Sequence, residues 1–413
     1  MSKSIPEQGA SWDAVRRELE SFGKGDADWR SARTAVYVFN AGEDVLRVAK
    51  DAYALYQSEN ALGPLAFPSL KRMEDDVVAM GLSLLHGPDG ACGNMTSGGT
   101  ESIMMAVKTC RDQARAQGRD TAGAEILAPI SAHPAFDKAA HYLGLRVVRV
   151  PVADDLRADV PAMAEAIGPR TLMLVGSAPC FPYGVIDPIE ALGEVAQQRG
   201  LWLHVDACVG GYFAPFARMN GIDVPPFDFE VPAVCSMSAD LHKYGYAAKG
   251  ASTVLHRSEE QRAHQIFEFG DWPGGHMTTP TLAGTRPGGA IAGAWAVMHY
   301  LGIEGYRQKA RQVTDAREQL TKGLAELGLH PLGDPRLGLL AYRCDDLDMR
   351  AVYGQLFRKG WFTGFTTDPA SIHLMLSPAH LSVVDSYLDD VRAAVDYVKQ
   401  TGATGDGVTT RYA

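Results

Sequence analysis

Short apolar runs alternate with helix-length segments through the middle of this chain. Strands that alternate with helices form βαβ units, and their parallel strands are apolar throughout because helices cover both faces of the sheet. The pattern therefore predicts an α/β fold with a mostly parallel sheet. The expected strands are Ile126–Ile130, Arg146–Val150, Thr171–Ser177, Leu201–Asp206, Ala233–Ser236 and Ala251–Leu255.

Both ends of the chain depart from this alternation. The N-terminal residues read as an arm that ends in a helix over Glu43–Tyr56, where apolar side chains recur at helical spacing. After residue 300, a long helical stretch and short strand-like segments predict a smaller C-terminal α+β domain. We therefore expect three parts, which are an N-terminal arm over 1–60, a large domain over 61–300 and a small C-terminal domain over 301–413.

Composition excludes several classes of function. The chain has 413 residues and a formal net charge of −10. Such a charge does not predict the basic surface that binds nucleic acids or anionic membranes. Its N-terminus is polar, and no stretch approaches the roughly 18 apolar residues of a membrane span, so we expect a cytoplasmic protein without a membrane anchor. Its 6 cysteines have neither CxxC nor His–Cys ligand spacing, which favours reduced thiols over disulfides or a metal site.

A glycine-rich turn precedes one of the predicted helices. In the segment Thr96–Ser102, Gly98 and Gly99 allow the backbone to approach a ligand, and Thr100 adds a hydroxyl group. The first N–H groups of the following helix and the helix dipole attract an anion. An ordinary helix N-cap gives the same pattern, so the turn alone does not establish an anion site.

A carboxylate and a histidine come at the ends of two predicted strands. Asp206 closes the strand Leu201–Asp206, and the carboxyl ends of parallel strands are where α/β proteins bind their ligands. His133 follows the strand Ile126–Ile130, where its ring would stack on a planar ligand. Each residue alone also fits a structural role, the aspartate as a helix cap and the histidine as a core residue with satisfied hydrogen bonds.

A lysine follows a further predicted strand, Ala233–Ser236. Lys243 has His242 and small residues as neighbours. Burial at such a position lowers the pKa of an amine, as imine formation requires. A solvated surface lysine is the alternative interpretation.

The order of these motifs is more specific than any one of them. Pyridoxal 5′-phosphate needs an anion site for its phosphate, a ring against its own ring, a carboxylate that keeps its pyridine nitrogen protonated, and a lysine for its aldehyde. The glycine turn, His133, Asp206 and Lys243 supply these groups in that order along the chain. The sequence therefore predicts a pyridoxal-phosphate enzyme.

From about residue 35 to residue 380, the chain resembles the sphingosine-1-phosphate lyases. These enzymes are a branch of the fold-type-I pyridoxal-phosphate family, which also contains the group II amino-acid decarboxylases. The resemblance implies the fold-type-I transferase fold and a homodimer with its active sites at the interface. The matching segments are Thr96–Ser102, Ser131–His141, Phe181–Pro188, His204–Gly211, Ser238–Gly250 and Gly284–Gly289.

The resemblance also implies which residues hold the cofactor. Lys243 would bind it as a Schiff base, and Asp206 would pair with the pyridine nitrogen. The ring would stack on His133. The phosphate would be held by Gly99, Thr100 and His242.

The substrate site matches that of the lyases only in part. Tyr37 matches an arm tyrosine that helps to hold or process the substrate, and Lys249 matches a basic residue that contacts the substrate phosphate. Asn60 begins a segment that reads roughly Asn-x-Leu-His-Pro in the lyases and is a further candidate for substrate binding. Here Gly63 replaces the histidine of that segment, which holds phosphate in the lyases. A charge-assisted hydrogen bond contributes roughly 1.5–3 kcal/mol, so it is open whether the substrate is phosphorylated.

The function implied is that of a carbon–carbon lyase. Such an enzyme cleaves an amino alcohol, for example a sphingoid base 1-phosphate, into an aldehyde and an amine by a retro-aldol reaction, with Lys243 or Tyr37 transferring the proton. The alternatives are an amino-acid decarboxylase, a β-hydroxy-amino-acid aldolase and a non-catalytic protein that binds the cofactor. Tyr37 and Lys249 favour the lyase, whereas Gly63 weakens that preference. We expect no metal.

Overall fold

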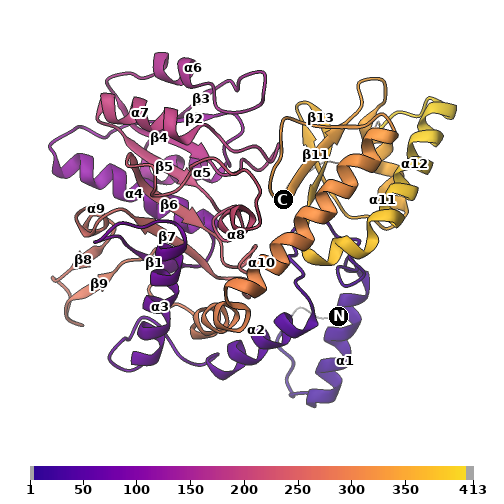
Figure 1. The fold of residues 1–413 in the computed structure, drawn as a ribbon. Coiled ribbons are helices and arrows are strands. Elements are labelled where there is room, and N and C mark those ends of the chain that lie inside the picture. The colour runs from indigo at the N-terminus through magenta and orange to yellow at the C-terminus, as the bar shows by residue number, and fades with distance from the viewer. Residues whose placement is uncertain (1–3, 406–413) are drawn as a thin grey trace.

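The computed structural model describes residues 4–405, which form a seven-stranded sheet, a four-stranded sheet and a two-stranded hairpin (Figure 1). The strands of the largest sheet are β1 (Cys92–Thr96), β2 (Glu125–Pro129), β3 (Arg146–Val150), β4 (Thr171–Ser177), β5 (Trp202–Asp206), β6 (Val234–Ala239) and β7 (Ser252–His256). They lie in the order β1-β7-β6-β5-β4-β2-β3. All neighbours from β6 to β3 are parallel, whereas β7 is antiparallel to both β1 and β6. This sheet confirms the predicted α/β fold.

Helices cover both faces of the seven-stranded sheet, and the central strands β4 and β5 are buried at every position as a result. On one face, α4 (Gly99–Ala116) and α5 (Ala135–Leu143) pack in one apolar cluster with Trp202 of β5. On the other face, α7 (Ile189–Arg199) belongs to a larger cluster with Leu203 of the same strand. Other helices around this sheet are α3 (Pro68–Leu84), α6 (Val160–Glu165), α8 (Ala214–Met219) and α9 (Glu259–Ala263).

A second, antiparallel sheet lies in the C-terminal part of the chain. Its strands are β10 (His330–Pro331), β11 (Leu339–Arg343), β12 (Gly364–Thr367) and β13 (Ala370–Met375), in the order β10-β11-β13-β12. Helices α11 (Met349–Arg358) and α12 (Val384–Thr401) accompany it. The resulting α+β arrangement agrees with the prediction for this part of the chain.

The long helix α10 (Gly288–Glu326) runs from the side of the large sheet to the small sheet (Figure 1). It is interrupted at Gly302, whose φ of 55° and ψ of −176° are not helical. Glycine adopts a positive φ readily because it has no Cβ. The break lies beside the boundary we predicted at residue 300, although the three domain boundaries themselves stay a prediction.

The N-terminal arm contains a helix that the sequence reasoning missed. Helix α1 (Trp12–Phe22) begins after Ser11, whose side chain accepts a hydrogen bond from the N–H of Ala14. None of its residues is buried, and its apolar side chains, such as Trp12 and Phe22, are exposed. The predicted helix of the arm is present as α2 (Glu43–Leu55), which packs along α10.

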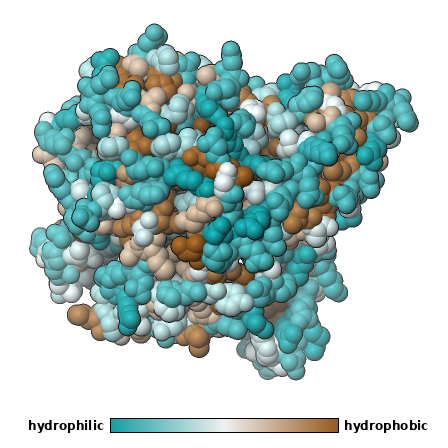
Figure 2. Space-filling model, viewed as in Figure 1, coloured by the Kyte–Doolittle hydropathy of each residue, from teal (hydrophilic) through white to brown (hydrophobic). Residues whose placement is uncertain are grey.

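The surface in Figure 2 is mostly hydrophilic, with apolar side chains in separate patches. The hairpin of β8 (Phe267–Phe269) and β9 (Met277–Thr279) also carries exposed large apolar side chains, including Trp272 in its turn. No helix within residues 4–405 is long and apolar enough to cross a membrane. All 6 cysteines are free.

Candidate active site

A cavity of about 400 Å³ lies at the carboxyl ends of the central parallel strands. Asp206 ends β5, and the turn that contains His242 and Lys243 follows β6. The cavity brings together all the residues that we expected to hold the cofactor. They are Gly99, Thr100, His133, Asp206, His242 and Lys243.

The backbone of the glycine turn packs closely against other residues of the cavity, as the two glycines in its sequence suggest. A Cβ atom on Gly99 would lie 2.7 Å from Sγ of Cys208 and 2.9 Å from Oδ2 of Asp240, so a side chain there would have no room. The carboxylate of Glu101 accepts hydrogen bonds from the N–H and the hydroxyl of Ser97, which holds the turn in place. The first N–H groups of α4 have no acceptor within their own helix, and an anion at this turn would supply one.

Lys243 forms an ion pair that the sequence reasoning missed. Its Nζ lies 2.9 Å from Oδ2 of Asp240, which is 2% exposed. Burial acts to lower the pKa of Lys243, but the carboxylate of Asp240 outweighs it, and the pKa is raised above its ordinary value. Our expectation of a lowered pKa is therefore wrong for the chain on its own, because burial brings a counter-ion with it. The signal was present in the sequence, since Asp240 stands three residues before the lysine.

His242 lies near the same carboxylate oxygen. Its Nε2 is 3.6 Å from Oδ2 of Asp240, and burial lowers its pKa to about 4. Among the residues that the structure describes, the buried Nδ1 of His242 and the buried Oδ1 of Asp240 have no hydrogen-bond partner. Gly98 lies beside this ring, because a Cβ atom there would be 3.5 Å from Cε1 of His242. An unpartnered ring nitrogen beside the glycine turn fits a phosphate group.

Hydrogen bonds hold the side chains of Asp206 and His133 in place. Oδ1 of Asp206 accepts hydrogen bonds from the N–H of Cys208 at 3.1 Å and from Oγ of Ser238 at 3.2 Å. Within residues 4–405, no hydrogen bond is found to its Oδ2, although the carboxylate lines the cavity. Nδ1 of His133 accepts a hydrogen bond from the N–H of Ala135, and burial lowers the pKa of this histidine. His133 thus also has the structural role that we considered, at the start of α5.

These groups fit pyridoxal 5′-phosphate. The glycine turn and His242 are suited to its phosphate, and the available oxygen of Asp206 is suited to a protonated ring nitrogen. Lys243 is the primary amine in the cavity wall. Burial and charged neighbours shift the pKa of several side chains in this one place, as is typical of active sites.

Lys249 lies next to this cavity but lines another one. The second cavity, also of about 400 Å³, lies between the arm with α2 and the turn from Tyr246 to Lys249, and His242 borders both cavities. Nζ of Lys249 donates to the carbonyl oxygen of His242 at 3.1 Å and lies 5.5 Å from the ring centre of Phe39. Its side chain reaches solvent, yet neighbouring protein atoms and the charge of Lys243 lower its pKa to about 8.

Two predicted substrate residues do not line either cavity in the described chain. Tyr37 is 46% exposed and its ring centre lies 6.4 Å from that of Phe362. Oδ1 of Asn60 accepts hydrogen bonds from the N–H of Leu62 at 2.9 Å and of Arg286 at 3.4 Å. Asn60 therefore has a structural role here, and its role toward a substrate stays a prediction.

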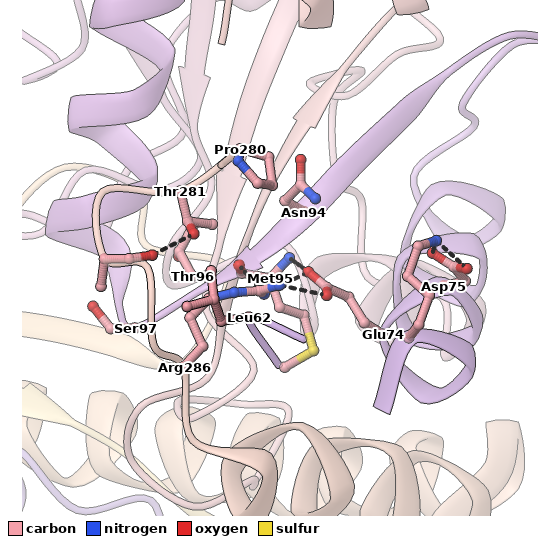
Figure 3. A network of polar contacts seen from close by, with 12 residues as sticks. Leu62, Glu74, Asp75, Asn94, Met95, Thr96, Ser97, Pro280, Thr281 and Arg286 are labelled. Atoms are coloured by element: carbon pink, nitrogen blue, oxygen red, sulfur yellow. Dashed lines mark hydrogen bonds and ion pairs between the residues drawn. The ribbon is translucent and has the colours of Figure 1, made fainter. Parts of the chain in front are cut away.

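The backbone of Arg286 contacts Asn60, and its side chain reaches Glu74 near Met95 and Thr96, as Figure 3 shows for the side chain. Its guanidinium group forms two hydrogen bonds with the carboxylate of Glu74, at 2.7 and 2.9 Å. It also donates to the carbonyl oxygen of Met95, whose N–H donates to Glu74. This network joins the arm, α3 and β1 just before the glycine turn. Arg286 lies in the matching segment Gly284–Gly289, but nothing in the sequence indicated that Glu74 is its partner.

Comparison with known proteins gives consistent results. Residues 2–344 match the pyridoxal-dependent decarboxylase conserved domain. The chain is 42% identical to a sphingosine-1-phosphate lyase of Arabidopsis thaliana over 403 residues, which cover 96% of this chain and 74% of that protein. It is 39% identical to sphingosine-1-phosphate lyase 1 of Mus musculus over 400 residues, or 96% and 70% of the two chains.

Solved structures agree with these relatives. The sphingosine-1-phosphate lyase of Burkholderia pseudomallei superposes with a TM-score of 0.93 at 35% identity, and the match covers 97% of this chain and 94% of that chain. Glutamate decarboxylase of Lactobacillus brevis superposes with a TM-score of 0.84 over 97% and 96% of the two chains. At 20% identity, the second match speaks for the fold alone.

Proposed function

The chain belongs to the sphingosine-1-phosphate lyases within the pyridoxal-dependent decarboxylase family, and from this premise we propose that it cleaves a phosphorylated long-chain amino alcohol. The reaction is a retro-aldol cleavage. The hydroxyl at C3 loses its proton, the C2–C3 bond breaks, C3 leaves as an aldehyde, and C2 then takes up a proton. The products are an aldehyde and a phosphorylated amine.

Pyridoxal 5′-phosphate is the cofactor, and when bound it accepts the electron pair of the breaking bond. We propose that Lys243 binds its aldehyde and that Asp206 meets its ring nitrogen through Oδ2. His133 would lie against the ring, while Gly99, Thr100 and His242 hold the phosphate. The supporting observation is that these residues come from four separate segments and line one cavity.

Lys243 is the candidate for moving the proton at C2. Asp240 lies 2.9 Å from its Nζ and favours the charged form, so the lysine would be an ammonium group whenever it is not bound to the cofactor. An ammonium group in the cavity wall is a proton donor. Tyr37, the other candidate, lies outside the cavity of the described single chain.

The observation that carries the substrate proposal is the position of Lys249. It borders a cavity that shares His242 with the proposed cofactor cavity, and its Nζ donates to the carbonyl oxygen of His242, which is proposed to hold the cofactor phosphate. A lysine binds phosphate as a point charge, without the fixed geometry of arginine. This favours an anionic substrate, while Gly63 leaves the position of the family's histidine without a donor.

A homodimer is part of the proposal. Helix α1 buries none of its residues, and an isolated helix of 11 residues is marginal in water. Its exposed apolar side chains, Trp12, Val15, Leu19 and Phe22, would be covered by a second copy of the chain. A second copy could also bring Tyr37 to the cavity. A cytoplasmic location stays a prediction.

Product analysis tests the function. The protein with bound cofactor is incubated with a phosphorylated long-chain amino alcohol, with its unphosphorylated counterpart and with a panel of amino acids, and products are identified by mass spectrometry. We expect a long-chain aldehyde from the phosphorylated substrate, and none with the Lys243→Ala variant. Carbon dioxide and an amine from an amino acid, without any aldehyde, would make the protein a decarboxylase and overturn the proposal.

A further inference from the structure

A continuous chain of hydrogen bonds lies behind Asp206, in the interior of the large sheet. Nε1 of Trp202 donates to Oγ of Ser236 at 2.8 Å, and this Oγ lies 2.8 Å from Nδ1 of His204. Nε2 of His204 lies 3.3 Å from Oγ of Ser238, which donates to Oδ1 of Asp206 at 3.2 Å. Both serines and His204 are fully buried.

The register of two neighbouring strands places these side chains together. In the parallel pair of β5 and β6, His204 is opposite Ser236 and Asp206 is opposite Ser238. Alternate residues of a strand point to the same face of the sheet, so Trp202, His204 and Asp206 share a face. The hydrogen bonds therefore run across the two strands and along them, toward the carboxyl end.

The direction of every proton in this chain is fixed from both ends. The indole of Trp202 can only donate and the carboxylate of Asp206 can only accept. Ser238 gives its one proton to Asp206, so it must accept from Nε2–H of His204. Burial lowers the pKa of His204 to about 4, so the ring is neutral and carries one proton. Its Nδ1 is then an acceptor for Ser236, which itself accepts from Trp202.

We propose that Trp202, Ser236, His204 and Ser238 are positioning residues for Asp206. Their aligned donors end on Oδ1, so they fix the carboxylate and leave Oδ2 for the ring nitrogen of the cofactor. Hydrogen-bond chains in which each group polarises the next stabilise a charge at their end. The inference rests on the proposed pairing of Asp206 with that nitrogen.

A second serine beside Asp206 provides a matched control. Ser177 on β4 is opposite Asp206 in register, as Ser238 is on β6. Both side chains are buried, but Oγ of Ser177 has no hydrogen-bond partner within the described residues. Ser177→Ala and Ser238→Ala thus each remove a serine hydroxyl group from a strand position opposite Asp206. Only Ser238→Ala interrupts the chain of hydrogen bonds.

The test reads the protonation of the ring nitrogen directly. Each variant is reconstituted with pyridoxal 5′-phosphate labelled with ¹⁵N in the ring, and the nitrogen signal is recorded by NMR without substrate. In Ser238→Ala we expect the signal to move toward the neutral pyridine value and kcat to fall about tenfold with little change in KM. Ser177→Ala should match the unchanged protein in both. The proposal is overturned if Ser238→Ala leaves the signal in place, or if Ser177→Ala moves it equally.

Variants of His204 test the inner part of the chain. His204→Gln keeps an N–H donor toward Ser238, whereas His204→Leu removes it. The glutamine variant should therefore shift the nitrogen signal less, and lower kcat less, than the leucine variant. If the leucine variant does not fold, Trp202→Phe removes the first donor alone, and we expect a smaller shift in the same direction. If the glutamine and leucine variants shift the nitrogen signal equally, or if Trp202→Phe does not shift it, the effect is confined to Ser238. The proposed role of His204, Ser236 and Trp202 is then overturned. The NMR measurement needs no substrate. Its results therefore test the role of these residues even if the protein does not cleave a phosphorylated amino alcohol.

Discussion

The Nζ atom of Lys243 and the Oδ2 atom of Asp240 are 2.9 Å apart in the wall of the candidate active-site cavity. Asp240 is almost fully buried, so each charge depends on the other in the absence of a ligand. In the function proposed above, Lys243 must also lose its proton to attack the aldehyde of the cofactor. The ion pair therefore links the stability of this turn to the step in which the cofactor is bound.

Replacement of Asp240 should speed cofactor binding near neutral pH. Asp240→Asn removes the charge that holds the pKa of Lys243 above its ordinary value, so a larger fraction of the amine is neutral. The association rate of pyridoxal 5′-phosphate with the apoprotein should rise about tenfold for each unit by which the pKa falls. Stopped-flow absorbance at several pH values measures this rate. An unchanged rate-against-pH profile would contradict a role for Asp240 in controlling Lys243.

Loss of the lysine should cost stability as well as activity. Lys243→Ala leaves the Asp240 carboxylate buried without its counter-ion, and breaking a buried pair in this way costs about 3–5 kcal/mol in the free energy of unfolding. The double variant Lys243→Ala with Asp240→Asn removes both charges and should recover most of that loss. Urea unfolding of the apoproteins compares them. Both variants should lack turnover, and borohydride should trap the cofactor on Lys243 in the unchanged protein only.

The large sheet was predictable from the sequence because its strands are buried on both faces. The segments Arg146–Val150 and Thr171–Ser177 were predicted at the bounds that β3 and β4 have. β1 was missed because Cys92–Thr96 contains glycine and polar residues and reads as a loop. Helix α1 was missed because its sequence reads as a polar arm. None of its residues is buried in the described chain.

The gathering of the candidate site residues in one cavity was predictable because they fall at strand ends, which a parallel sheet brings together. What the sequence could not show is which partner each group has. The distance from Lys243 to Asp240 depends on the turn after β6, and the separation of Tyr37 from the cavity depends on how the arm packs on the C-terminal part. The network behind Asp206 depends on the register of β5 and β6, which no single motif contains.

The pair of Glu74 and Arg286 should be the most costly ion pair to break outside the cavity. Both side chains are nearly buried and their two hydrogen bonds are well formed (Figure 3). Arg286→Met leaves the carboxylate of Glu74 without its counter-ion and should lower the free energy of unfolding by about 3–5 kcal/mol. The double variant Arg286→Met with Glu74→Gln should lie between this value and the unchanged protein. Urea unfolding monitored by circular dichroism measures the free energy of unfolding of each variant. A double variant as unstable as the single one would contradict the ion-pair explanation.

The affinity for a phosphorylated substrate should fall as the pH rises through about 8. Lys249 is charged below its pKa of about 8 and loses its proton above it. Its attraction for a dianionic phosphate is therefore present at neutral pH and lost in more alkaline solution. We expect the KM of the phosphorylated substrate to rise between pH 7 and pH 9, while that of the unphosphorylated one changes little. Lys249→Met should remove the difference between the two pH profiles, and a persisting difference would show that another group titrates.

A histidine at position 63 should restore a phosphate contact that this chain lacks. Gly63 does not have a positive φ, and the atom that a Cβ there would meet first is Cβ of Ala66, at an ordinary 3.8 Å. The loop thus accepts a side chain without strain. Gly63→His should lower the KM of a phosphorylated amino alcohol by up to about tenfold, equivalent to about 1.4 kcal/mol. Gly63→Leu is the control for size, since it adds bulk without a donor and should not lower KM. If histidine and leucine give the same KM while Lys249→Met still raises it, the substrate phosphate is held at Lys249 without any contribution from the Gly63 segment.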